Sequence, residues 1–91
     1  MGFLLFFFDK NTIFAVKSHY FVIMEHLGNI LKERRKTLSI TQREAAALSG
    51  IGVNTLTKIE RGEANPSLKV VMRILTTLGL EMDIRIKTGV L

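Results

Sequence analysis

The chain contains no cysteine, which excludes disulfide cross-links and thiolate metal sites. It also lacks an apolar run of the about 20 residues that a membrane-spanning helix needs; the run from Phe3 to Phe8 is far shorter. The early positive charge, longer apolar core and small-residue cleavage site of a signal peptide are missing too. We therefore expect a cytoplasmic protein without a membrane segment.

Residue combinations that would support catalysis or metal binding are also scarce. His19, Glu25 and His26 are close in sequence, but two histidines and one carboxylate near a helix start are more simply read as surface residues. Ser18 precedes His19 without a supporting acid, and residues 49–52 lack the preceding strand and the lysine of a phosphate-binding loop. The sequence predicts no enzyme activity, no cofactor and no metal.

Negative charge is in the minority. The chain of 91 residues has a formal net charge of +5, which favours a polyanionic partner, and its length allows one small domain. Basic residues are concentrated between positions 32 and 61, namely Lys32, Arg34, Arg35, Lys36, Arg43, Lys58 and Arg61. A solvated basic face would give the same pattern, so charge alone does not identify the partner.

The most informative segment runs from Thr41 to Gly62 and begins with a helix start signal. Thr41 is a good N-cap, and Glu44 three residues later completes a capping box. Ile40 before the cap can pack on Ala45 as a hydrophobic staple. Small helix-forming residues follow as far as Leu48, and Gly50 supplies a turn because glycine tolerates positive φ. This pattern predicts a short helix that ends in a tight turn.

A second short helix is predicted from Val53 to Glu60. Gly52 can cap its start and Gly62 can end it, while Leu56 and Ile59 lie three apart and face inward. The opposite face carries Asn54, Thr55 and Lys58. Together the two segments predict a helix-turn-helix whose second helix has the polar face of a recognition helix.

The segment from Thr41 to Gly62 resembles the phage-repressor/Cro-type helix-turn-helix family, whose pattern is T-Q-x-E-x-A, then a glycine, then I-x-x-x-E-x-G. The matching residues are Thr41, Gln42, Glu44, Ala46, Gly50, Leu56, Ile59, Glu60 and Gly62. The resemblance covers roughly Leu27 to Leu80 and implies a mainly α fold of four to five helices that binds double-stranded DNA.

The resemblance also implies roles for single residues. Base edges would be met by Val53, Asn54 and Lys58, with Gly52 allowing close approach of the backbone; Asn54 could read adenine, Lys58 guanine and Val53 a thymine methyl. Phosphates would be held by Gln42 and Arg43, and further phosphate candidates are Thr55 and Arg61. A solvated helix face is the alternative for Asn54 and Thr55. In the family, the acid at Glu60 pairs with the base at Arg35 and is structural.

The remaining apolar pattern predicts a helical core around this unit. Residues 25–36 carry Leu27, Ile30 and Leu31 at helical spacing, and Leu38 extends the set. After the turn at residues 65–67, an amphipathic stripe consists of Leu68, Val71, Met72, Leu75 and Leu78. The prediction is four helices within residues 25–78, inside a DNA-binding domain of residues 25–79.

From Leu80 to Lys87, apolar and charged residues alternate strictly, which predicts a strand. A lone strand cannot satisfy its backbone, so we expect antiparallel pairing with a second subunit, although packing on the same chain is the alternative. The dimerisation residues would be Leu80, Met82, Ile84 and Ile86. This ending resembles the C-terminal strand of HipB-type antitoxins, which implies a possible kinase-like toxin partner. Residues 80–91 form this strand and tail.

Residues 1–24 form an apolar N-terminal extension without an assigned role. Phenylalanine and β-branched residues around the turn-like Asp9 to Thr12 predict two or three extended segments. Alternatively the stretch is not native, because Met24 is a natural start for a domain of this family.

The sequence as a whole predicts a homodimeric repressor that binds an inverted-repeat operator. It would be the antitoxin and autorepressor of a toxin–antitoxin operon, or a free-standing repressor. A helical protein-interaction module without DNA binding is the other alternative. The operator sequence and any small-molecule effector cannot be read from these residues.

Overall fold

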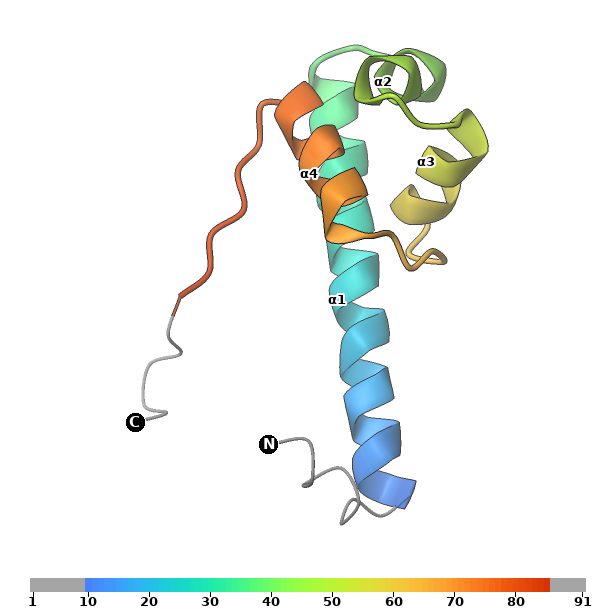
Figure 1. Cartoon of the computed structure of the whole chain (residues 1–91), viewed down its shortest axis with the longest axis vertical. Coiled ribbons are helices and arrows are strands. Elements are labelled where there is room, and N and C mark those ends of the chain that lie inside the picture. The colour runs from blue at the N-terminus through green and yellow to red at the C-terminus, as the bar shows by residue number, and fades with distance from the viewer. Residues whose placement is uncertain (1–9, 86–91) are drawn as a thin grey trace.

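The computed structural model describes the backbone of residues 10–85 and the side chains of residues 20–85. It contains four helices in the order α1 (Lys10–Thr37), α2 (Gln42–Ser49), α3 (Val53–Glu60) and α4 (Leu68–Thr77), and the part described holds no strand. Figure 1 shows α1 as a long rod, with α2, α3 and α4 gathered around its C-terminal half. The mainly α, four-helix expectation is confirmed.

The start of α1 differs from the sequence prediction. Extended segments were expected before Glu25, but the chain is helical from Lys10 onward. No glycine or proline occurs between Lys10 and Leu27, and extending an existing helix costs less than nucleating one. The residues before Glu25 therefore extend the helix of residues 25–37 toward the N-terminus, although many of them are phenylalanine or β-branched. Residues 1–9 lie outside the described part.

Residues 20–25 of α1 contact the loop between α3 and α4. The Tyr20 hydroxyl donates a hydrogen bond to Asn65 Oδ1 at 2.8 Å, and Met24 is buried. Gly62 has a φ of +75°, and a Cβ there would lie 2.9 Å from the Cα of Glu25. Glycine at this position therefore lets the loop pass directly against α1.

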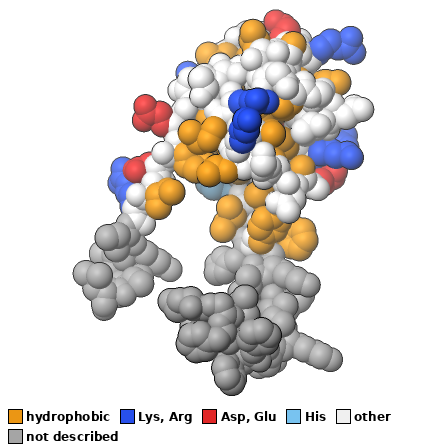
Figure 2. Space-filling model, viewed as in Figure 1, with side chains coloured by type: hydrophobic (Ala, Val, Ile, Leu, Met, Phe, Trp, Pro, Cys, Tyr) orange, Lys and Arg blue, Asp and Glu red, His pale blue; other side chains and the backbone are white. Residues whose placement is uncertain are grey.

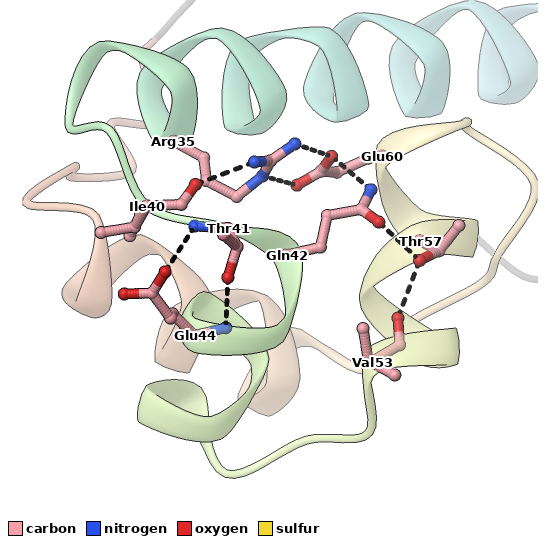
Figure 3. Close-up of polar contacts among 8 residues, drawn as sticks. All are labelled: Arg35, Ile40, Thr41, Gln42, Glu44, Val53, Thr57 and Glu60. Atoms are coloured by element: carbon pink, nitrogen blue, oxygen red, sulfur yellow. Dashed lines mark hydrogen bonds and ion pairs between the residues drawn. The ribbon is translucent and has the colours of Figure 1, made fainter.

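The short helices begin and end where the capping residues predict. Thr41 Oγ1 accepts a hydrogen bond from the Glu44 amide at 3.0 Å, and the Thr41 amide donates to Glu44 Oε1 at 3.2 Å (Figure 3). Gly50 ends α2 with a φ of 71°, and Ser67 Oγ accepts from the Val70 amide at the start of α4. The capping box and the glycine turn are confirmed, and Ser67 caps α4.

The core lies where α2, α3 and α4 meet α1. Its largest fully buried side chains are Leu31, Leu56, Ile59, Ile74 and Leu78. Ala45 and Ala46 are also buried, and their small size lets α2 approach its neighbours closely. Each fully buried Leu or Ile contributes about 1.5–3 kcal/mol, so these five side chains dominate the packing energy.

Some of the predicted core residues lie at the surface. Ile30, Leu38, Leu68 and Met72 are exposed, whereas Ile74, which the predicted stripe omitted, is fully buried. The buried face of α4 is formed by Val71, Ile74, Leu75 and Leu78, a spacing of three and four residues. Met72 lies beside that face, and Leu68 stands at the helix start, beyond the reach of the core.

The predicted C-terminal strand is absent from residues 80–85, which have no regular secondary structure. Leu80 packs partly against the core, whereas Met82 and Ile84 are exposed and Ile86 lies outside the described residues. Arg85 forms an exposed ion pair with Asp83 of the same chain. No strand lies elsewhere in residues 10–85 to pair with this segment, and an unpaired strand is unstable. Pairing across a dimer therefore stays a prediction.

A buried ion pair joins α1 to α3. Arg35 Nε donates to Glu60 Oε2 at 2.7 Å and Arg35 Nη2 donates to Glu60 Oε1 at 3.0 Å, so the contact is bidentate (Figure 3). The two side chains are only 11% and 2% exposed. Arg35 Nη1 also donates to the Ile40 carbonyl at 2.9 Å. Hydrogen bonding to Glu60 raises the pKa of Arg35 above its ordinary value, which keeps the guanidinium charged.

Gly28 marks the point at which α1 and α3 touch. A Cβ there would lie 2.5 Å from the Ile59 carbonyl oxygen and 2.6 Å from that of Glu60. Both atoms belong to the backbone, so neither can move aside without shifting α3. Glycine inside a helix costs about 0.5–1 kcal/mol relative to alanine, and the close helix contact outweighs this cost.

We expect Gly28→Ala to lower the free energy of unfolding by about 1–3 kcal/mol, because the methyl group forces α1 and α3 apart. Chemical denaturation measures the change. Asn29→Ala is the matched control: Asn29 is exposed on the same helix, so alanine should leave stability unchanged or raise it slightly. A Gly28→Ala protein as stable as the parent would show that the helices can separate without loss.

Glu60→Ala should lower the free energy of unfolding by about 3 kcal/mol, because it leaves the mostly buried Arg35 charge without a partner. Glu63→Ala removes an exposed acid near the same helix end and should change stability by less than about 0.5 kcal/mol. Thermal or chemical melts compare the two variants. Equal effects would mean that the ion pair contributes no more than an ordinary surface charge.

Candidate nucleic-acid interface

The third helix has two distinct faces. Leu56, Ile59 and Glu60 are buried against the rest of the domain, which fixes the rotation of α3 about its axis. Because these positions are three and four residues apart, the intervening polar residues face away from the core. Asn54, Thr55 and Lys58 are exposed. Three of the four residues that sequence reasoning assigned to DNA contact on this helix thus lie on one exposed surface of a fixed element.

The start of α3 leaves room for close approach of a ligand. Gly52 is the N-cap, has an extended conformation and provides no side-chain cap for the helix. A Cβ at this position would meet only Thr55 Oγ1, at 3.8 Å, so the fold itself does not require glycine here. Val53 is half-buried and packs against the core, so only part of its side chain is available.

Arg43 and Gln42 occupy the first turn of α2 but lie in different environments. Arg43 is exposed. Gln42 is half-buried: its Nε2 donates to Glu60 Oε1 at 2.9 Å, and its Oε1 accepts from the Thr57 hydroxyl at 3.0 Å (Figure 3). The side chain predicted to hold a phosphate therefore bridges α2 and α3. One N–H of its amide is not used in these two bonds.

Thr57 is a site residue that sequence reasoning missed. Its hydroxyl lies within hydrogen-bond distance of both Gln42 Oε1 and the Val53 carbonyl, and it is half-buried at the contact between α2 and α3. The only sequence signal is a hydroxyl residue on the side of α3 that borders its buried face. With Arg35, Glu60 and Gln42 it forms a polar network that connects α1, α2 and α3 (Figure 3).

Exposed basic residues lie on α3, directly after it and at the start of α2. Lys58, Arg61 and Arg43 are exposed, and within residues 20–85 none of them forms an ion pair. The acid closest to them in the polar network, Glu60, is already bonded to Arg35. Exposed cations around an outward polar helix face are the arrangement that favours contact with a phosphate backbone.

Among the described residues, no group of three or more histidine, aspartate or glutamate side chains is placed to hold a metal ion. His26 is exposed, as expected, whereas the side chain of His19 lies outside this part and its surface placement stays a prediction. None of the helices described is long and apolar enough to span a bilayer.

Comparison with known proteins identifies the same unit. A family model described as helix-turn-helix matches residues 31–84. A protein of Methanococcus maripaludis, named as an HTH-type transcriptional regulatory protein, is 36% identical over 66 residues, which cover 72% of this chain and 20% of that protein. An uncharacterised HTH-type transcriptional regulator of Methanothermobacter thermautotrophicus is 38% identical over 55 residues, covering 60% of this chain and 80% of the relative.

A solved structure has the same fold. The crystal structure of the restriction-modification controller protein C.AhdI from Aeromonas hydrophila matches with a TM-score of 0.63 and 30% sequence identity, covering 66% of this chain and 91% of that one. The present chain spans about a fifth of the length of the Methanococcus relative. The family match extends over more than half of the chain and includes α2, α3 and α4. The chain belongs to the Cro/C1-type helix-turn-helix family of DNA-binding regulators.

Proposed function

We propose that this protein is a sequence-specific, dimeric DNA-binding repressor that inserts α3 into the major groove. The observation that carries this proposal is the division of α3 into a buried face and an exposed polar face. A helix whose rotation is fixed by Leu56, Ile59 and Glu60 presents the same outward residues to every site that it meets. Constant presentation is what base readout requires.

Base readout is assigned to the N-terminal half and centre of α3. Asn54 has the donor and acceptor pair that matches adenine, and Lys58 can donate to guanine O6 and N7. Val53 offers the exposed part of its side chain to a thymine methyl, and Gly52 lets the backbone come close to the groove. These contacts would supply the sequence preference of the protein.

Phosphate contacts on and around α3 would position the domain on the DNA. Arg43 at the first turn of α2, Thr55 on α3 and Arg61 after it are exposed and suited to this role. Gln42 can use its remaining N–H for a phosphate while its other bonds hold α2 against α3. Because each phosphate contact releases counterions, binding should weaken steeply as salt concentration rises.

Dimerisation would bring two recognition helices onto an inverted repeat, with half-sites about one helical turn, about 10 bp, apart. Residues 80–87 are the proposed dimerisation segment. Met82 and Ile84 are exposed in the single chain, and antiparallel pairing with a second copy would satisfy the segment's backbone and cover these side chains.

The antitoxin role is a finer proposal that depends only on the resemblance of this C-terminal segment to HipB-type antitoxins. A neighbouring gene for a kinase-like toxin would support it, and its absence would favour a free-standing repressor acting in the cytoplasm. A protein-interaction module without DNA binding is the remaining alternative. Exposed Asn54 and Lys58 on a fixed helix disfavour that alternative, because such a module has no need of them.

Substitutions on α3 test the proposed readout. Lys58→Ala should weaken binding to the best site by about 1–3 kcal/mol and relax the preference at one base position. Asn54→Ala should act similarly at a different position. Arg43→Ala should weaken binding to all sequences and reduce the salt slope by about 1. Selection from a random duplex pool identifies the best site, and fluorescence anisotropy at several salt concentrations measures the affinities.

Arg73→Ala is the control for loss of positive charge, since Arg73 lies on α4 and is not among the proposed DNA contacts. It should leave sequence preference unchanged. If Lys58→Ala and Asn54→Ala bind the best site as tightly as the parent, α3 is not the reading element.

Ile84→Ser tests the proposed dimer. Ile84 is 89% exposed in the single chain, so the substitution should leave the fold intact and weaken dimerisation by removing apolar burial. Glu81→Ser on the alternate, charged positions is the matched control and should change dimerisation less. Light scattering over a concentration series measures both. If instead Phe21→Ser dissociates the dimer and Ile84→Ser does not, the exposed apolar residues Phe21, Val22 and Ile23 of α1 form the dimerisation element.

A further inference from the structure

A second surface of the domain has no role in the proposed DNA contacts. An open groove of about 720 Å³ lies between the C-terminal end of α2 and the outer face of α4. It is lined on the α2 side by Leu48 and Ser49, and on the α4 side by Lys69, Met72, Arg73 and Thr77. No residue of α3 lines it, and Gln42 and Arg43 lie at the opposite end of α2.

The groove combines exposed apolar side chains from both helices. Leu48 is 70% exposed and Met72 is 45% exposed. A single exposed leucine needs no explanation, but here two large apolar side chains from different helices border one concave surface. Methionine adapts its shape readily, which suits a surface that accommodates another molecule.

The charge of the groove has one sign. Lys69 and Arg73 are four residues apart on α4 and therefore lie on the same side of that helix. None of the residues that line the groove is acidic, and within residues 20–85 neither cation forms an ion pair. Figure 2 shows a basic cluster at the place of α4, with hydrophobic side chains beside it.

Hydrogen bonds within the chain hold the residues at the bottom of the groove in place. Ser49 is buried, and its hydroxyl donates to Thr77 Oγ1 at 2.9 Å. The Thr77 hydroxyl in turn lies 3.0 Å from the Arg73 carbonyl, to which it donates. These bonds hold α2 against α4 and satisfy the polar atoms beneath the groove, so a ligand there would be held by the exposed apolar and cationic groups.

We propose that this groove binds an acidic amphipathic helix of a partner protein. Apolar side chains of that helix would pack on Leu48 and Met72, and its carboxylates would pair with Lys69 and Arg73. A nucleic-acid backbone would satisfy the two cations but would leave the apolar side chains without partners. Because α3 does not contribute to the groove, such a partner can bind while the protein is on DNA. The proposal goes beyond DNA binding and does not depend on it.

The probe for this proposal is a synthetic peptide of about 16 residues. Its leucines at positions 2, 6, 9 and 13 would lie on one face of a helix, with glutamates on both sides of that face and alanine elsewhere. It is titrated into the full-length, isotope-labelled protein and followed by chemical shifts. Saturable shift changes should be confined to residues 47–50 and 69–77. A scrambled peptide of equal composition and a version with lysine replacing glutamate should bind at least about tenfold more weakly.

Variants identify the groups that bind the peptide. The double variant Lys69→Glu/Arg73→Glu should weaken peptide binding roughly tenfold or more, and Leu48→Ser should weaken it several-fold. Lys32→Glu/Lys36→Glu is the matched control, because it reverses two charges at the same four-residue spacing on α1. It should leave peptide binding unchanged, and none of these variants should alter the base preference of the protein.

Four results would overturn the proposal. In the first two, the peptide fails to bind or changes the chemical shifts of α3 instead, or the Lys69→Glu/Arg73→Glu protein binds the peptide as tightly as the parent. In the third, the same double variant loses affinity for all duplexes equally, which would assign the two cations to phosphate contacts. In the fourth, Leu48→Ser changes the oligomeric state, which would place a second copy of the chain in the groove. None of these results bears on readout by α3, which the Lys58 and Asn54 variants test separately.

Discussion

The contact between Arg35 and Glu60 determines where α3 lies. An isolated helix of eight residues is unstable in water, so α3 depends on its neighbours for both its formation and its orientation. Glu60 meets a charge from α1 and an amide from α2 at the same carboxylate. One buried group therefore fixes the end of α3 against two other helices, and the exposed face of α3 inherits its direction from that contact.

The polar network and the apolar core have complementary tasks in this small domain. Leu56 and Ile59 supply the burial that stabilises α3, but apolar contacts are non-directional and tolerate small rotations. The bidentate bonds to Glu60 and the Gln42–Thr57 bond have narrow geometric limits. Burial of Leu56, Ile59 and Glu60 thus sets which face of α3 is inward, and the hydrogen bonds narrow its rotation further.

Local signals in the sequence predicted the local structure well. The Thr41 and Glu44 capping box, the Gly50 turn and the inward positions of α3 each depend on residues within a few positions of one another. Features that depend on distant partners were not accessible in this way. The Gln42–Thr57 bond joins two helices, and the burial of Ile74 rather than Met72 depends on how α4 packs. The first residues of α1 are helical because they extend the helix formed by residues 25–37. The strand predicted at residues 80–85 is a further case, because residues 10–85 contain no second strand with which it could pair.

The Gly28 contact has a consequence for genetics. Nothing is smaller than glycine, and the two carbonyl oxygens that face Gly28 belong to the backbone. A mutagenesis screen for unstable protein should therefore recover Gly28 changes of every chemical type, although this residue lies away from the exposed Asn54, Thr55 and Lys58 of α3.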